Sequence, residues 1–242
     1  MFKTVVANWK DHPATEEEAV ALALASDFEN AVVCPPHRFL DAAGSVLHQA
    51  RLGAQDYGPD DKDRRVAYVI VGHSDRRKEG ETNDIIAEKV ALAAADGLIP
   101  ILCVGETHEQ RARGQKEEVI REQVRVGLSK MQDLGFKIQE LLIAYEPVWA
   151  ISTESGTRPE KPEDAVASIA FIKEQLLHFF NPDSRFKIPD VRFLYGGSVS
   201  SENVQIFISQ NDIDGVLVGA ASLNPEEIKQ IWQITQTATA KK

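Results

Sequence analysis

The sequence predicts an α/β protein, an eight-stranded parallel β/α barrel with a truncated third crossover. Two observations lead to this prediction. Short runs of apolar and β-branched residues recur eight times along the 242 residues, and nearly every run is followed by turn residues and a segment with helical apolar spacing. Strands that are apolar on both faces and separated by helices belong in a parallel sheet that helices cover.

The element boundaries follow from the same patterns. We expect strands at residues 4–7, 31–34, 51–54, 67–71, 99–104, 141–144, 191–194 and 215–218. We expect helices at residues 16–28, 39–50, 82–96, 108–131, 162–180, 202–209 and 225–234. Thr15, Thr107 and Pro162 precede acidic residues and are typical of helix starts, because acidic side chains are favoured in the first turn. The tail from Thr235 to the end is expected to fray.

Eight strand–helix units favour a closed barrel over an open, doubly wound sheet. The open sheet would be supported by a G-x-G-x-x-G motif after the first strand, but Asn8-Trp9-Lys10 stands there instead. Residues 55–66, which form the third crossover, are too few, too polar and too rich in turn residues for a full helix. We therefore expect a crossover of about one turn within a single catalytic domain that covers residues 1–242.

Composition excludes several classes of function. The chain has 27 Lys and Arg against 37 Asp and Glu, a formal net charge of −10, and no extended basic stripe, so nucleic acid and anionic membrane are not expected as partners. No apolar run has the length of a membrane-spanning helix, and the first residues lack a signal-peptide core. Cys34 and Cys103 lie in apolar runs, as buried free thiols do. A cytoplasmic location is expected.

The chemistry of a parallel β/α barrel lies at the carboxyl ends of its strands. The segments there include ANWK at residues 7–10, GHSDRR at 72–77, PILCVGET at 100–107, AYEPVWAI at 144–151, YGGSV at 195–199 and DGVLVGAASL at 214–223. Six such strings, in this order and over nearly the whole chain, resemble the triosephosphate isomerase family. The resemblance implies interconversion of dihydroxyacetone phosphate and D-glyceraldehyde 3-phosphate, a step of glycolysis and gluconeogenesis, without cofactor or metal.

Two alternatives remain at this stage. The chain could be another barrel enzyme that acts on a small phosphorylated sugar, or a non-catalytic phosphate-binding protein or scaffold. The combination of Asn8, Lys10, His73 and Glu146 argues against the first alternative. The second is motivated by departures from the family pattern at Asp75, Ala220 and the segment after Ile151.

Glu146 and His73 are the expected proton-transfer pair. Pro147 restricts Glu146 to extended backbone, and apolar neighbours such as Leu217 would strip hydration from the carboxylate, which suits proton abstraction next to a carbonyl. The resemblance assigns Glu146 the role of catalytic base. A helix that starts after His73 would favour a neutral imidazole, which the resemblance makes the electrophile.

Lys10 and Asn8 are expected to point into the same mouth if strand alternation persists beyond the first strand. Lys10 would attract a phosphate-bearing substrate and stabilise the charge of the enediolate, while Asn8 donates a hydrogen bond to a substrate oxygen. The expected tether of Lys10 is Asp75, where the family has the longer Glu. Glu106 and one of the arginines at 76 and 77 are expected to pair with neighbours and orient the site.

Small residues after the last two strands suggest a phosphate site. Backbone N–H groups near Ser198, Gly219 and Ala220 can approach an anion, and barrels often bind phosphate at this place. Ala220 stands where the family usually has the second glycine of a pair. An alanine fits there only if the backbone φ at this position is negative. The resemblance adds a backbone N–H of Ser152, at the start of a lid that is longer than usual.

The short third crossover also bears on assembly. In the family this loop docks into a neighbouring subunit, but residues 55–66 are too short and polar to bury much area. We expect the usual dimer interface to be lost, which leaves a monomer or a homodimer through another surface.

Overall fold

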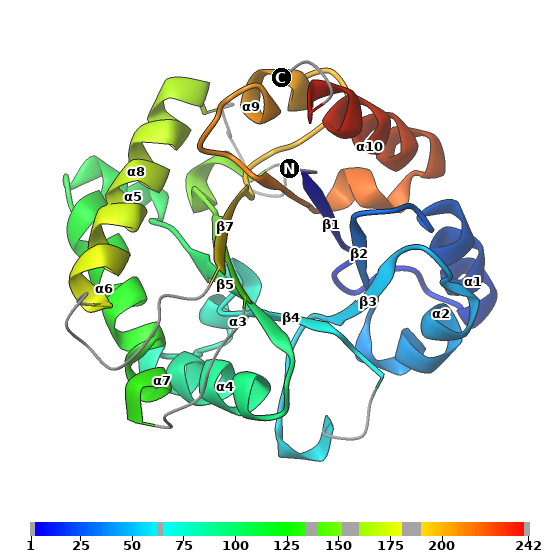
Figure 1. Cartoon of the computed structure of the whole chain (residues 1–242), viewed down its shortest axis with the longest axis horizontal. Coiled ribbons are helices and arrows are strands. Elements are labelled where there is room, and N and C mark those ends of the chain that lie inside the picture. The colour runs from blue at the N-terminus through cyan, green and yellow to red at the C-terminus, as the bar shows by residue number, and fades with distance from the viewer. Residues whose placement is uncertain (1–2, 62–64, 134–139, 152–159, 181–189, 240–242) are drawn as a thin grey trace.

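The computed structural model describes residues 3–61, 65–133, 140–151, 160–180 and 190–239. Eight parallel strands form a closed barrel in chain order, and the last strand pairs with the first. A ring of helices surrounds the strands (Figure 1). The predicted eight-stranded β/α barrel is therefore confirmed.

The strands lie close to their predicted positions. They are β1 Thr4–Asn8, β2 Ala31–Cys34, β3 Arg51–Ala54, β4 Tyr68–Val71, β5 Ile99–Val104, β6 Glu140–Tyr145, β7 Asp190–Tyr195 and β8 Gly215–Val218. The strands are apolar on both faces because successive residues point alternately into the barrel and toward the helices. In β6, Leu142 and Ala144 pack inside the barrel, whereas Leu141 and Ile143 pack against the helices. Leu217 of β8 also lies inside the barrel.

The helices cover the outside of this barrel. They are α1 Glu16–Ala25, α2 Leu40–Val46, α3 Ser74–Lys78, α4 Asn83–Ala95, α5 His108–Ala112, α6 Lys116–Gly127, α7 Ser129–Asp133, α8 Pro162–Phe179, α9 Val204–Ile208 and α10 Pro225–Thr239. Short 3-10 helices are η1 His37–Phe39, η2 Pro59–Asp61, η3 Val148–Ala150 and η4 Ala220–Leu223. In the described part of the chain, no helix combines the length and apolar character needed to span a membrane.

Local signals for helix starts are confirmed. Thr15 and Thr107 each form a capping box, in which the threonine and the side chain three residues later satisfy each other's backbone N–H groups. Pro162 occupies the first turn of α8. These caps stabilise helix starts without tertiary contacts, which is why the sequence alone could locate them.

Two helix predictions were wrong. Residues 108–131 do not form one helix, because the chain turns between α5 and α6 at Gly114, where φ is 70°, and turns again before α7. The tail does not fray at Thr235, which is fully buried and donates its hydroxyl to Ile231 O at 2.7 Å. Helix α10 continues to Thr239 because tertiary packing outweighs the weak helix propensity of this segment.

The third crossover is short, as predicted. Its described residues contain a single 3-10 turn, η2. The segment folds back onto its own barrel, where Tyr57 is buried and donates its hydroxyl to Asp96 Oδ2 at 3.1 Å. The crossover thus packs against α4 and the end of β3.

The contact between β1 and β8, where the barrel closes, predicts that one glycine cannot be replaced without loss of stability. We call this contact the seam. A Cβ atom at Gly215 would lie 2.1 Å from the backbone oxygen of Thr4, whereas one at Gly58 would contact only Asp61 Oδ2 at 3.8 Å. Gly215→Ala should lower the free energy of unfolding by about 3 kcal/mol, because the seam must open to accept the methyl group. Gly58→Ala is the control and should change it little. Urea unfolding followed by circular dichroism measures both, and equal midpoints would contradict this account.

Candidate active site

A narrow cavity opens at the carboxyl ends of the barrel strands. It brings together seven residues predicted from the sequence, and its lining comprises Asn8, Lys10, His73, Glu146, Ile151, Gly196, Gly197, Leu217, Gly219 and Ala220. Five strands, β1, β4, β6, β7 and β8, contribute residues at or just beyond their ends. The cavity therefore depends on the closed barrel and on no single local segment.

Glu146 is a buried residue of the cavity lining. Only 3% of its surface is exposed, and its Oε2 accepts a hydrogen bond from the backbone N–H of Ser74 at 3.3 Å. Its Oε1 lies 3.3 Å from His73 Nε2. The backbone is held from the neighbouring strand, because a Cβ atom at Gly105 would lie 1.8 Å from Glu146 O. Only glycine permits this close approach of β5 to the end of β6.

His73 caps the short helix α3. Its Nδ1 accepts a hydrogen bond from the backbone N–H of Asp75 at 3.2 Å. A nitrogen that accepts this bond carries no proton, so Nε2 carries the proton of the neutral ring. The N–H of the imidazole therefore faces Glu146 and the cavity. This agrees with the helix start expected after His73.

Lys10 reaches the cavity by a route that the sequence did not reveal. Strand alternation does not persist beyond Asn8, because Lys10 has a left-handed backbone with φ of 53°. The side-chain oxygen of Asn8 accepts a hydrogen bond from Lys10 N at 3.0 Å and supports this turn. Lys10 Nζ lies 2.9 Å from Asp75 Oδ2, so the shorter carboxylate still reaches the lysine.

The charge of Asp75 is stabilised in this position. Partial burial acts to raise its pKa, but the hydrogen bond from Lys10 and the nearby charges of His73 and Lys10 outweigh burial. The pKa of Asp75 is consequently lower than that of a free carboxyl. The carboxylate stays ionised and forms an ion pair with Lys10.

The predicted phosphate residues fall into three groups. Gly219 and Ala220 line the cavity, and Ala220 starts η4 without the left-handed backbone that glycine would allow. Ser198 lies outside the cavity lining, and its backbone N–H donates to Ala150 O at 3.0 Å. Ser152 lies outside the described residues.

Two further residues were not singled out from the sequence. Gln55 donates through its amide to Lys10 O at 2.8 Å and to Cys34 O at 2.9 Å. Ser74 supplies the backbone N–H to Glu146. Gln55 directly follows β3, so its place at a strand end was an available signal.

Comparisons with known proteins agree with this geometry. The sequence model of the family described as "Triosephosphate isomerase" matches residues 3–235. The chain belongs to the triosephosphate isomerase family. It is 38% identical to the triosephosphate isomerase of Dictyoglomus thermophilum, with 97% of this chain and 99% of that protein covered. It is 37% identical to the protein of the same name from Symbiobacterium thermophilum, with 98% of each covered.

Behind the cavity, this member of the triosephosphate isomerase family carries a buried acidic cluster. Glu106 has no exposed surface and accepts hydrogen bonds from Trp149 Nε1 at 2.8 Å and Arg111 Nη1 at 3.1 Å. The hydroxyl of Tyr145 lies 3.2 Å from both Glu106 Oε2 and Glu160 Oε1. Glu106 thus pairs with neighbouring side chains, and Arg77 donates to Gly72 O and Cys103 O.

Glu160 is the member of this cluster that sequence analysis missed. It is 2% exposed, and burial raises its pKa to about 8, with the charge of Lys116 opposing this rise and that of Glu106 adding to it. No local pattern marks Glu160, because its surroundings come from distant segments. At neutral pH the side chain is mainly protonated, and its Oε1 accepts the hydrogen bond from the Tyr145 hydroxyl.

The raised pKa of Glu160 predicts a stability that depends on pH. Between pH 4.5 and about 8 the unfolded chain loses the Glu160 proton while the folded chain retains it, so rising pH favours unfolding. The stability of the parent relative to Glu160→Gln should fall over this window, by up to about 1.4 kcal/mol per pH unit, and then level off. Chemical unfolding of both proteins at several pH values measures the difference. Parallel stability curves would contradict the assignment.

Proposed function

We propose that Glu146, His73, Lys10 and Asn8 carry out the aldose–ketose isomerisation of this family. The chain is an isomerase that interconverts dihydroxyacetone phosphate and D-glyceraldehyde 3-phosphate, a reaction of glycolysis and gluconeogenesis. The observation that carries the residue assignment is the 3.3 Å approach of His73 Nε2 to Glu146 Oε1 in one buried cavity. A base and a neutral N–H donor thus face the same small volume.

Glu146 acts as the base. Its carboxylate takes a proton from the carbon next to the substrate carbonyl and returns it to the neighbouring carbon, through a cis-enediolate. Both carboxylate oxygens have partners in the structure, so one contact, to Ser74 N or His73 Nε2, must be released when the substrate is attacked. Burial among Ile151 and Leu217 keeps the carboxylate poorly hydrated before that step.

His73 and Lys10 stabilise charge on the substrate oxygens. The Nε2–H of His73 donates to the carbonyl and enediolate oxygens, and the Lys10 ammonium supplies the positive charge nearby. Asn8 lies beside both and adds a hydrogen bond to a substrate oxygen. The four side chains need no metal or cofactor for this proton transfer.

The phosphate of the substrate lies over the ends of β7 and β8 in this proposal. Gly219 lies next to Lys10, since a Cβ atom at Gly219 would be in ordinary van der Waals contact with Lys10 Cε at 3.7 Å. Backbone N–H groups at Gly219 and Ala220 approach the anion, and Ser152 adds a third N–H. Ser198 contributes its hydroxyl, because its backbone N–H already donates to Ala150 O. Residues 1–242 act in this proposal as one catalytic domain.

The usual dimer interface of the family is absent in this proposal. The third crossover, described at residues 55–61 and 65–66, is held by its own barrel through Tyr57 and by Lys89, whose Nζ lies 2.5 Å from Asp56 Oδ1. Contacts within the chain therefore occupy Asp56 and Tyr57, which are not free to dock into a neighbour. We propose a monomer or a homodimer that uses another surface, and a cytoplasmic location in which the buried thiols of Cys34 and Cys103 stay free.

The base assignment predicts the behaviour of Glu146→Gln. The replacement is nearly isosteric but cannot accept the proton, so kcat should fall by about 10²–10⁴-fold while the fold is retained. A coupled assay with glyceraldehyde 3-phosphate measures kcat, and circular dichroism checks the fold. Glu122→Gln, on the exposed face of α6, is the matched control and should keep full activity. Turnover by Glu146→Gln close to the parent rate would exclude Glu146 as the base.

The assembly proposal predicts that residues 55–61 make no contact with a second chain. Sedimentation equilibrium at micromolar concentration gives the mass, and Asp60→Arg, a charge reversal within the crossover, should leave that mass unchanged. A crystal structure with this segment inserted into a neighbouring subunit would overturn the proposal.

A further inference from the structure

The backbone of Lys10 needs external support. Its φ of 53° lies in the left-handed region, which is unfavourable for a residue with a long side chain. Residues in such conformations persist when the surrounding structure holds them in place. The position of the Lys10 ammonium therefore depends on the groups that bind Lys10.

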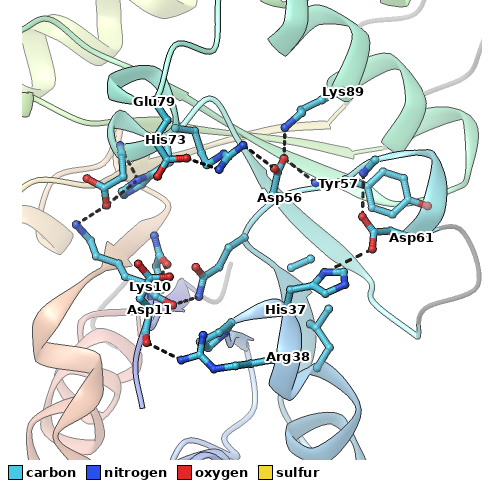
Figure 2. Close-up of a pocket in the computed structure, with 18 residues that line it drawn as sticks. Lys10, Asp11, His37, Arg38, Asp56, Tyr57, Asp61, His73, Glu79 and Lys89 are labelled. Carbon is cyan, nitrogen blue, oxygen red and sulfur yellow. Dashed lines mark hydrogen bonds and ion pairs between the residues drawn. The ribbon is translucent and has the colours of Figure 1, made fainter. Parts of the chain in front are cut away.

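Two side chains that line one wide pocket hold Lys10. Asp75 binds its Nζ at 2.9 Å, and Gln55 donates to its backbone oxygen at 2.8 Å. This pocket, of about 630 Å³, lies beside the catalytic cavity and shares Asn8, Lys10 and His73 with it (Figure 2). Asp75 belongs to α3, whereas Gln55 belongs to the third crossover.

The residues that follow Gln55 and Asp75 in the chain carry opposite charges and form an ion pair. Asp56 follows Gln55, Arg76 follows Asp75, and Arg76 Nη2 lies 3.3 Å from Asp56 Oδ2. The contacts thus form a closed ring that runs from Lys10 through Asp75 and Arg76 to Asp56 and Gln55, and back to Lys10. We call these five residues the lysine ring.

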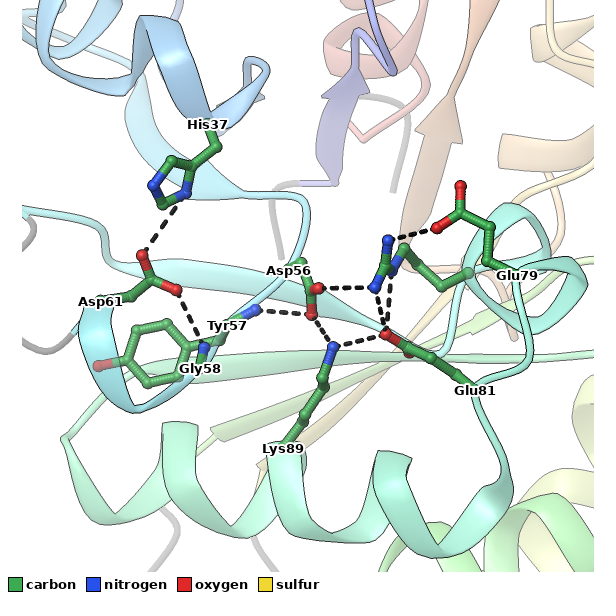
Figure 3. Close-up of polar contacts among 9 residues, drawn as sticks. His37, Asp56, Tyr57, Gly58, Asp61, Glu79, Glu81 and Lys89 are labelled. Atoms are coloured by element: carbon green, nitrogen blue, oxygen red, sulfur yellow. Dashed lines mark hydrogen bonds and ion pairs between the residues drawn. The ribbon is translucent and has the colours of Figure 1, made fainter.

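The Asp56–Arg76 pair is itself anchored. Lys89 of α4 binds Asp56 Oδ1 at 2.5 Å and Glu81 Oε1 at 2.5 Å, and Glu81 also binds Arg76 Nη2 at 2.9 Å (Figure 3). The backbone N–H of Tyr57 donates to Asp56 Oδ1 at 2.8 Å. These contacts fix the third crossover relative to α3 and α4.

We propose that Asp56 and Arg76 are positioning residues for Lys10. Their ion pair fixes the distance between Gln55 and Asp75, and these two side chains then hold Lys10 in the catalytic cavity. The proposal rests on the proposed role of Lys10 in binding the substrate. It assigns the shortened third crossover a part in catalysis. It also makes the support of Lys10 internal to one chain.

A purely structural role would give a different result. The side chains of Asp56 and Arg76 are 37% and 38% exposed, so the contact between them adds little to the stability of the fold. Their less exposed partners, Lys89 and Glu81, still pair with each other at 2.5 Å when either residue is replaced. Loss of the Asp56–Arg76 pair should therefore displace the Lys10 ammonium and weaken ligand binding while the stability of the protein changes little. Ligand affinity and stability can then be separated.

The first experiment removes each charge of the pair. Asp56→Asn and Arg76→Gln should each raise the inhibition constant of glycerol 3-phosphate, which lacks the carbonyl, and lower kcat/KM about 3–10-fold, with melting temperatures within a few degrees of the parent. Asp212→Asn is the matched control, since it breaks a partly exposed pair with Lys173 on α8. If both variants match this control in affinity and kcat/KM, the proposal is wrong.

The second experiment tests whether the effect passes through Lys10. In a Lys10→Ala background, Asp56→Asn should change neither the inhibition constant nor kcat/KM further, because the group it positions is gone. An equal effect in both backgrounds would overturn the positioning role. If Asp56→Asn does not fold, the same comparison with Arg76→Gln decides the question.

The same measurements separate this proposal from the proposed function. If Lys10→Ala binds glycerol 3-phosphate as tightly as the parent does, the role of Lys10 itself fails, and the positioning role fails with it. If Lys10→Ala loses affinity but the two ring variants do not, the positioning proposal alone fails.

Discussion

The pairing of β1 with β8 is the constraint on which the site depends. It sets Val6 opposite Leu217 and Ala7 opposite Val218, residues more than two hundred positions apart in the chain. The next residues along the two strands are Asn8 and Gly219. This register therefore places the segment that carries Lys10 beside the segment that carries Gly219 and Ala220. The hydroxyl of Ser222 reaches Asn8 O at 3.4 Å and reinforces the seam. Without closure, the two halves of the cavity would have no fixed relation.

The fold and the central residues of the site could be predicted from the sequence because both follow from local patterns. Buried parallel strands have a distinctive apolar composition, and parallel strands bring their carboxyl ends to one face whatever the details of packing. His73 and Glu146 could be placed on this basis alone. The match to family motifs then gave them their expected roles.

Other features could not be predicted because they arise from contacts between distant segments. Lysine gives no local signal for a left-handed backbone, so the turn at Lys10 was missed. Glu160 looks like a surface residue until Tyr145 and Glu106 surround it. The single helix predicted over residues 108–131 failed at Gly114, where one glycine within a strongly helical pattern decides the break.

The inside of the barrel holds two thiols that take no part in the proposed chemistry. Cys34 and Cys103 both pack in the inner core, and burial raises the pKa of each, with the charge of Glu146 adding to the effect at Cys103. A protonated, enclosed thiol does not react with alkylating reagents. Modification of these cysteines therefore requires the strands to separate. The rate at which a maleimide labels the native protein therefore reports how often the barrel opens, without the need to introduce a cysteine.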